Sequence, residues 1–163
     1  ATELVTVHNE NCQFIPHISV LRVGQTLRIK NSDPVGHILN IDGFKNEPVV
    51  ANLPVKNTVD ATFQVAERVP SIMKSSMYPW MEGYVVIKDH GYVAVSQRNG
   101  SFEIRGLPTG TFRFQAWHEK AGYVRRVTVD DAKTTWDKGR FELELRDDVD
   151  LGDIVIESAL FAT

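Results

Sequence analysis

The three methionines of this sequence are the side chains with the clearest potential for metal chemistry. They fall within nine residues, at Met73, Met77 and Met81. Thioether and imidazole groups are suitable ligands for Cu(I), so His37, Met81 and one of the other two methionines form one candidate copper site if the fold brings His37 close to them. Methionine also fills irregular gaps in a core, which is its more common role when it is clustered. The sequence leaves both interpretations open.

Cys12 and His17 form a second candidate metal site, with His37 as a third ligand. The first two residues lie five positions apart, and they reach His37 only if the strands that carry them pair suitably. Borderline metals accept such a set of ligands. The alternative is that Cys12 is a small buried side chain and that His17 forms a hydrogen bond at the start of a strand. A single cysteine excludes an internal disulfide framework and cysteine-rich zinc or iron–sulfur sites.

No catalytic signature is present in the sequence. It lacks the Gly-x-Ser-x-Gly, His-Glu-x-x-His and Gly-Lys-Ser/Thr patterns. His118 and Glu119 are neighbours in a predicted strand, so their side chains point to opposite faces and do not form an acid–base pair. We therefore expect the protein not to be an enzyme.

The overall composition is that of an ordinary globular protein. The 163 residues carry a formal charge of −3, and 42% of them are hydrophobic. The basic residues do not cluster, which argues against a nucleic-acid-binding surface. No apolar run approaches 18 residues, so we expect no membrane-spanning segment.

Short runs with a period of two dominate the sequence and predict an all-β protein. Residues 111–117 are an example, because Phe112 and Phe114 alternate with Arg113 and Gln115. Similar runs predict strands at residues 4–7, 18–23, 27–30, 59–65, 84–87, 92–95, 101–105, 124–129, 141–145 and 154–156. Residues 44–57 contain two prolines and predict a loop with at most a helical turn.

Turn signals separate these runs and suggest two units. Asn99-Gly100 between two alternating runs predicts a β-hairpin. The best boundary is at residues 88–91, after an apolar run and before a hairpin-rich stretch. We therefore predict domains at residues 1–88 and 89–163, a Greek-key β-sandwich packed against a second, smaller β-sandwich unit.

Two segments of the first predicted domain resemble the cupredoxin family, which includes plastocyanin and amicyanin. Residues 31–37 read Asn-Ser-Asp-Pro-Val-Gly-His, and residues 74–86 read Lys-Ser-Ser-Met-Tyr-Pro-Trp-Met-Glu-Gly-Tyr-Val-Val. In cupredoxins one histidine follows an Asn-rich turn. The other ligands come from a late loop that reads Cys-x-x-His-Pro-aromatic-Met-x-Gly. A thiolate, two imidazoles and a weak axial thioether form a type 1 copper site.

The resemblance places two retained and two replaced ligands. His37 matches the upstream histidine, and Met81 matches the axial methionine. Ser75 stands where the cysteine belongs, and Tyr78 stands where the second histidine belongs. The loop framework is matched by Pro79, Trp80 and Gly83. A hydroxyl is a poor ligand for a soft metal, so the resemblance implies a cupredoxin-like domain with a degenerate site and no copper cofactor, the alternative being an altered copper site.

Further segments extend the resemblance to both predicted domains. Residues 12–17 and 21–27 are similar to a bacterial methylamine-utilisation-like branch of the cupredoxins. Residues 91–117 resemble a carboxypeptidase-regulatory, transthyretin-like β unit. That second likeness concerns fold and says little about activity.

The resemblance also implies where the protein works and what it contacts. We expect a periplasmic or secreted bacterial protein, and the start at Ala1 rather than Met fits removal of a leader. Trp80 is expected to lie partly exposed in a loop that meets a protein partner. The hydroxyl of Tyr78 is expected to bond with Ser75 or His37, since a buried hydroxyl needs a partner. The sequence leaves the oligomeric state open.

Overall fold

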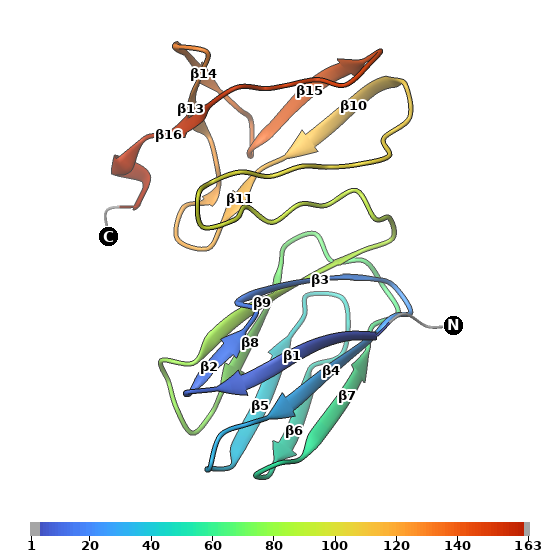
Figure 1. Ribbon diagram of the computed structural model, residues 1–163, viewed down its shortest axis with the longest axis vertical. Helices are drawn as coiled ribbons and strands as arrows, with labels where there is room; N and C mark the ends of the chain where they lie inside the picture. Colours follow the sequence, from blue (N-terminus) through green and yellow to red (C-terminus); the bar gives the residue numbers. More distant parts are fainter. Residues whose placement is uncertain (1–3, 162–163) are drawn as a thin grey trace. The chain divides into compact units, whose positions relative to one another are not determined.

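The computed structural model describes residues 4–161, whose regular secondary structure is almost all short β-strands (Figure 1). The internal contacts divide the chain into two compact units, Ala1–Arg105 and Gly106–Thr163. Among the described residues, no helix is long and apolar enough to span a membrane. The described regular structure is β-strand apart from one short 3-10 helix, so the all-β prediction is confirmed.

Two sheets form the first unit. The smaller sheet has the strand order β2-β1-β4-β7. Its strands are β1 (Leu4–Glu10), β2 (Gln13–Ile15), β4 (Thr26–Asn31) and β7 (Thr58–Thr62). The larger sheet has the order β3-β9-β8-β5-β6. Its strands are β3 (Ile18–Arg22), β5 (His37–Asp42), β6 (Val49–Leu53), β8 (Ser71–Ser75) and β9 (Glu82–Lys88). The pairs β1–β4 and β3–β9 are parallel, and the other pairs are antiparallel.

Alternation along the strands builds one core between these two sheets, so the first unit is a β-sandwich. In β4, Leu27 and Ile29 are fully buried while Lys30 is exposed, as period-two patterning requires. Both sheets supply the core, including Val7, Leu27, Ile29, Leu39, Ile41, Met73, Val85 and Ile87. Burial of each such side chain stabilises the fold by about 1.5–3 kcal/mol.

Strand β6 corrects the prediction of a loop at residues 44–57. Val49–Leu53 pairs with β5 in antiparallel register, from His37↔Leu53 to Ile41↔Val49. The strand fits between Pro48 and Pro54 and lies at the edge of the sheet, where prolines at the strand ends do not interrupt a ladder.

Residues 89–109 contain no strand, although residues 92–95 and 101–105 were predicted as strands. The turn at Asn99-Gly100 does form, because the amide of Gln97 donates to the carbonyl of Ser101 at 2.9 Å. The flanking runs form no ladder, so the predicted hairpin is wrong. The predicted boundary at residue 88 coincides with the end of β9, whereas the contacts group residues 89–105 with the first unit. That boundary stays a prediction.

The second unit consists of three small sheets. One pairs β10 (Gly110–Gln115) with β15 (Arg140–Leu145), and another pairs β11 (Trp117–His118) with β12 (Gly122–Tyr123). The third has the order β14-β13-β16, from β13 (Arg126–Val129), β14 (Ala132–Thr135) and β16 (Ile154–Ile156). A short 3-10 helix, η1 (Ser158–Phe161), follows. The buried core of the second unit consists of Val124, Val127 and Trp136.

Candidate functional site

His37 is the first residue of β5 and points into the sandwich. Along β5 the buried residues are His37, Leu39 and Ile41, which alternate with outward-facing residues. The alternation of the strand therefore directs the imidazole inward. Only 1% of the residue is exposed, so its polar atoms depend on protein partners.

The loop before β5 supplies one of these partners, Asp33. Its side chain is 4% exposed, and Oδ2 accepts a hydrogen bond from Nε2 of His37 at 3.0 Å. The backbone amide of Cys12 donates to both carboxylate oxygens, at 3.2 and 3.3 Å. Asn31 fixes this loop, because its Nδ2 donates to the carbonyls of Val35 and Leu53 and its Oδ1 accepts from the amide of Asp33.

The Asp33 contact leaves the other imidazole nitrogen available. In a neutral imidazole whose Nε2 donates to a carboxylate, the other nitrogen, Nδ1, carries a free lone pair. Nδ1 is buried and has no hydrogen-bond partner among the described residues. The fold therefore places an unsatisfied acceptor inside the sandwich.

Ser75 lies on the same face of the larger sheet as His37. It ends β8 and pairs with Leu39, which is two residues beyond His37 on β5. Ser75 and His37 are therefore diagonal neighbours across adjacent strands. Ser75 is 3% exposed, and its hydroxyl has no partner within the described part of the chain.

The loop from Ser76 to Met81 closes back onto Ser75. The amide of Met81 donates to the carbonyl of Tyr78 at 2.9 Å, and the amide of Ser75 donates to the carbonyl of Met81 at 3.4 Å. This closure places Met81 in the core, where it is 1% exposed. Two residues further on, Gly83 lies in a tight space, since a Cβ there would lie 3.1 Å from the carbonyl oxygen of His17.

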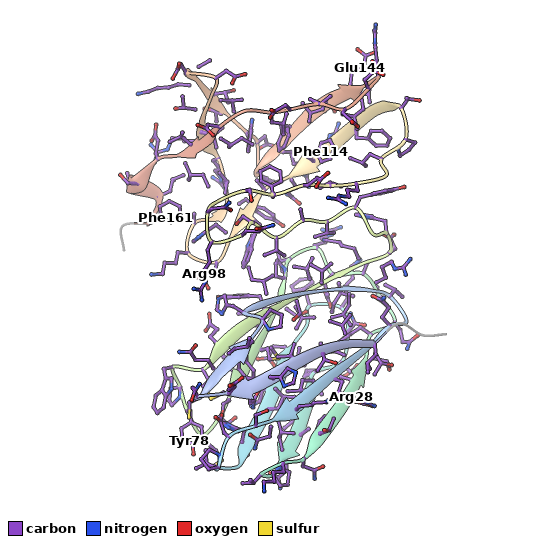
Figure 2. All side chains as sticks on the ribbon, viewed as in Figure 1. Arg28, Tyr78, Arg98, Phe114, Glu144 and Phe161 are labelled. Carbon is purple, nitrogen blue, oxygen red and sulfur yellow. The ribbon has the colours of Figure 1, made fainter. Side chains whose placement is uncertain are left out.

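Aromatic contacts join this loop to His37. The ring of Tyr78 meets the imidazole edge to face at a centroid distance of 5.1 Å, and Tyr78 also contacts the ring of Trp80 at 5.4 Å. Figure 2 shows Tyr78 at one end of the sandwich. Trp80 is 69% exposed. The predicted hydrogen bond from the Tyr78 hydroxyl to Ser75 or His37 is wrong, because Tyr78 reaches His37 through its ring.

Of the other two methionines, Met73 lies apart from His37 along the sheet, and Met77 is largely exposed. Met73 pairs with Ile41, four residues along β5 from His37, which corresponds to about 13 Å along a strand. It is fully buried, and its Cε faces Gly83. Met77 is 51% exposed. Of the three methionines, Met81 is the one that belongs to the loop closed onto Ser75 and is also buried.

The structure brings Cys12, but not His17, towards His37. Cys12 occupies the turn between β1 and β2 with a φ of 55°, and its amide is bound by the Asp33 carboxylate. The ring of His17 packs on Tyr84, which alternates with the inward-facing Gly83 and Val85. His17 therefore lies on the opposite face of the sheet from His37. No group of three or more His, Cys, Asp or Glu within residues 4–161 is arranged to hold a metal ion.

The donors around this site do not fit a type 1 copper centre. Ser75 and Tyr78 offer hydroxyls, and neither supplies the thiolate or the second imidazole that such a centre requires.

Ser75, His37 and Asp33 are also the residue types of a hydrolytic triad. All three are at least 96% buried, and no hydrogen bond joins Ser75 to His37 in the described structure. A substrate has no access to this serine.

Asp33 is the site residue that sequence reasoning missed. In the sequence it stands out only as part of the segment 31–37, four residues before His37. Asn9 was also missed. It is fully buried, pairs with Asn31 across β1 and β4, and both polar atoms of its side chain lack described partners.

A second buried carboxylate, Glu67, holds the loop after β5. Its Oε1 accepts from the amides of Lys45 and Asn46 at 2.8 and 2.9 Å and from Nδ2 of Asn46 at 2.9 Å. Burial acts to raise the pKa of Glu67, but these hydrogen bonds outweigh it and lower the pKa from its ordinary value. No sequence pattern indicated this contact.

Comparison with known proteins finds likeness of fold. No protein-family model and no curated protein sequence matches the chain. A copper-containing nitrite reductase from Thermus scotoductus SA-01 is 23% identical over 51% of this chain, with a TM-score of 0.47, and this chain spans 22% of its length. A copper(I) mutant form of amicyanin is 15% identical over 52% of this chain and 81% of its own, with a TM-score of 0.46. A purple cupredoxin from Nitrosopumilus maritimus is 17% identical over 52% of this chain and 99% of its own, with a TM-score of 0.44. These likenesses concern about half of the chain.

Proposed function

We propose that the first unit is a non-catalytic β module whose cupredoxin-like site no longer forms a type 1 copper centre. One observation carries the proposal. At the two positions assigned to the missing ligands, Ser75 has a buried, unpartnered hydroxyl and Tyr78 packs its ring against His37. Neutral oxygen donors at both positions remove the soft thiolate on which such a centre depends. The resemblance to cupredoxins suggests an exported protein, periplasmic or secreted.

In this proposal the module works by binding a partner through the loop that contains Trp80. The indole is 69% exposed, yet its ring contacts Tyr78, which in turn contacts the buried His37. An aromatic side chain that is held in place by its neighbours binds with little loss of rotamer entropy. Met77, in the same loop, adds a second exposed apolar side chain.

A second candidate function is that of a copper carrier or electron-transfer protein with an altered site. It is favoured by the buried, unpartnered Nδ1 of His37 and by the burial of Met81, whose backbone carbonyl accepts from the amide of Ser75. An imidazole and a thioether are ligands that Cu(I) accepts. Met73 and Met77 are weaker candidates, because Met73 lies four residues along β5 from His37 and Met77 is about half exposed.

A Cu(I) titration against a competing chelator distinguishes the two candidates. The unaltered protein is compared with His37→Ala and Met81→Ala, and Met73→Leu serves as a matched control for a buried methionine in the same core. The non-catalytic module predicts no affinity above that of the variants. Stoichiometric Cu(I) binding that is lost in His37→Ala and Met81→Ala, but kept in Met73→Leu, supports the carrier.

The assignment of the degenerate positions is tested separately by restoring the missing ligands. The double variant Ser75→Cys with Tyr78→His is expected to bind Cu(II) and to show the intense visible absorption of a thiolate–copper bond. Each single variant lacks one ligand and is the control. A correctly folded double variant that stays colourless with Cu(II) contradicts the assignment.

A further inference from the structure

Strand β6 is the last strand of the larger sheet in the first unit, and no strand within residues 4–161 pairs with its outer edge (Figure 1). An edge strand exposes unpaired main-chain N–H and C=O groups, which another chain can use to add a strand to the sheet. Proteins often prevent such pairing with a charged side chain on the edge. The five residues of β6 carry no charge, and Val50 at its outer face is 67% exposed.

The edge strand of the smaller sheet, β7, is protected in ways that β6 is not. The two strands contact each other, so both edges lie on the same side of the sandwich. In the middle of β7, the carboxylate of Asp60 pairs with the guanidinium of Arg28 at 2.6 Å. The amide of Thr58 already donates to Oδ1 of Asn57 at 2.8 Å. A charge and an occupied amide both hinder the addition of a strand, so β6 is the more available edge.

The main-chain groups of Val50 and Asn52 point to this open edge. Ile38 lies opposite Asn52 in the β5–β6 register, and its carbonyl accepts from the amide of Ser76, the residue after β8, at 2.9 Å. The main-chain groups of Ile38 therefore face β8 and not β6. In an antiparallel ladder, the residue opposite such a position also turns its groups outward. Asn52 and, two positions before it, Val50 thus present their N–H and C=O groups away from β5.

Prolines limit the open edge to these two residues and so restrict what can pair with it. Pro48 and Pro54 lie two positions before Val50 and two after Asn52, and neither has an N–H to donate. Antiparallel pairing with β6 of a second copy fits this limit. Val50 of each copy then lies opposite Asn52 of the other, and each of these pairs exchanges both of its N–H···O=C bonds. Ala51 lies opposite itself on the two-fold axis, where its small side chain permits close approach.

Charges beside the strand also favour two antiparallel copies. Glu47 precedes β6 and Lys56 follows it, both are exposed, and neither forms an ion pair within the described part of the chain. Antiparallel pairing brings the Glu47 end of each copy next to the Lys56 end of the other, and two-fold symmetry repeats the contact. Parallel pairing would place like charges together instead. Lys45 is two residues further from the strand than Glu47.

We propose that β6 is the surface through which two copies of this chain associate, as an antiparallel strand pair that joins their larger sheets. The strand has five residues, so the two copies meet over a small area. Small interfaces are typical of weak, transient association, and we expect a dissociation constant of about 1 mM. This inference is independent of the proposed function of the first unit.

The test is a dilution series of the full chain labelled with ¹⁵N, measured by sedimentation velocity and by amide chemical shifts. Val50→Pro removes an N–H that points outward, so the bonds between β6 and β5 remain. Val50→Lys places a charge on the edge. Val50→Thr keeps the amide and the β-propensity, and it is the matched control. Glu47→Lys and Lys56→Glu, alone and together, test the antiparallel direction.

We expect the unaltered chain to form a dimer at about 2 mM, with amide signals of Val50 and Asn52 that shift with concentration. Val50→Pro and Val50→Lys should weaken association at least about tenfold, whereas Val50→Thr should leave it nearly unchanged. Reversal of either charge alone should weaken it about threefold, and the double reversal should restore it. Amide exchange at β4 shows whether each variant folds, and Val50→Lys decides if Val50→Pro does not.

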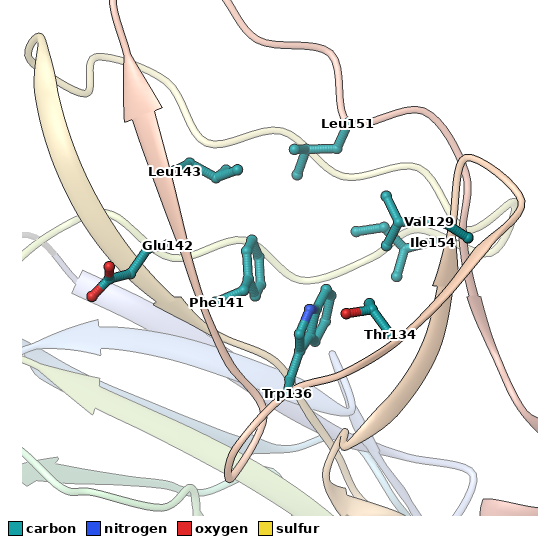
Figure 3. A pocket seen from close by; sticks show the side chains of 9 residues that line it. Val129, Thr134, Trp136, Phe141, Glu142, Leu143, Leu151 and Ile154 are labelled. Atoms are coloured by element: carbon teal, nitrogen blue, oxygen red, sulfur yellow. The ribbon is translucent and has the colours of Figure 1, made fainter.

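Three results overturn the proposal. One is a chain that stays monomeric at about 2 mM, which would leave the edge to a partner of different sequence. Another is association that Val50→Pro and Val50→Lys do not weaken. The third is a set of concentration-dependent shifts that lies elsewhere, for example at Trp136, Phe141 and Leu143, which line an apolar hollow in the second unit (Figure 3).

Discussion

The carboxylate of Asp33 accepts a hydrogen bond from Nε2 of His37 at 3.0 Å inside the sandwich. The two side chains are 4% and 1% exposed, so water does not replace this contact when it is lost. The same carboxylate binds the amide of Cys12 in the turn between β1 and β2. One aspartate therefore fixes the orientation of the histidine and connects two loops at this end of the fold.

The Asp33→Ala variant is expected to lose about 2–4 kcal/mol of unfolding free energy, because it leaves the buried Nε2 of His37 and the partly buried amide of Cys12 unpaired. Asp33→Asn keeps one acceptor oxygen and should lose less. Chemical denaturation of the three proteins measures this order. Equal stability of Asp33→Ala and the unaltered protein would contradict the described hydrogen bonds.

Ser75→Ala is expected to leave the stability unchanged or to raise it by up to about 1 kcal/mol, because the buried hydroxyl it removes has no partner. Ser76→Ala is the matched control. It removes the hydroxyl that accepts from Nδ2 of Asn40, so it should be slightly destabilising. A clear loss of stability in Ser75→Ala would reveal a partner for that hydroxyl.

Glu67→Gln is expected to lower the unfolding free energy at neutral pH by about 1–3 kcal/mol, since a charged acceptor of three hydrogen bonds becomes neutral. The pKa of Glu67 is lowered by folding. Its contribution is therefore complete above the ordinary glutamate pKa and is lost as the pH falls through the lowered value.

The difference between Glu67→Gln and the unaltered protein should accordingly shrink in acid. Denaturation curves recorded at several pH values measure it. Glu103→Gln alters an exposed glutamate and is the control. A constant difference at every pH would show that the glutamate charge has no part in holding the loop.

Gly43→Ala is expected to destabilise the fold by about 1–3 kcal/mol through overpacking. A Cβ at this position would lie 2.8 Å from Oε1 of Glu67 and 3.2 Å from the carbonyl oxygen of Asn46. Gly36→Ala is the matched control, since its Cβ would meet nothing closer than 3.9 Å. Thermal denaturation of the two variants should place Gly36→Ala much closer to the unaltered protein.

The strands with clear alternation were predictable from the sequence, and those that depend on a partner were not. Phe112 and Phe114 are half-buried beside the exposed Arg113, as their alternation predicts. Residues 92–95 have the composition of a strand but find no neighbour to pair with, and β-propensity reflects packing against neighbours. Strand β6 was missed because Pro48 and Pro54 flank this short edge strand directly, and two closely spaced prolines are typical of a loop.

The sequence predicted which positions belong to the candidate site, but not the contacts that hold them. The spacing of His37, Ser75, Tyr78 and Met81 could be read from two short segments. The burial of Asp33 could not, because its partner Cys12 is 21 residues away and belongs to a different loop. The contact of Glu67 with residues 45 and 46 escaped for the same reason.

The unequal cores of the two units bear on how these variants are measured. Within residues 4–161, fourteen hydrophobic residues form the buried cluster of the first unit and three form that of the second, so we expect calorimetry to resolve two endotherms. Trp117 and Trp136 belong to the second unit, and the remaining tryptophan, Trp80, is already largely exposed. Intrinsic fluorescence would thus follow the unfolding of the second unit, whereas the variants described above lie in the first unit. Amide exchange at β4 or β5 is the signal that reports on Asp33, Ser75 and Glu67.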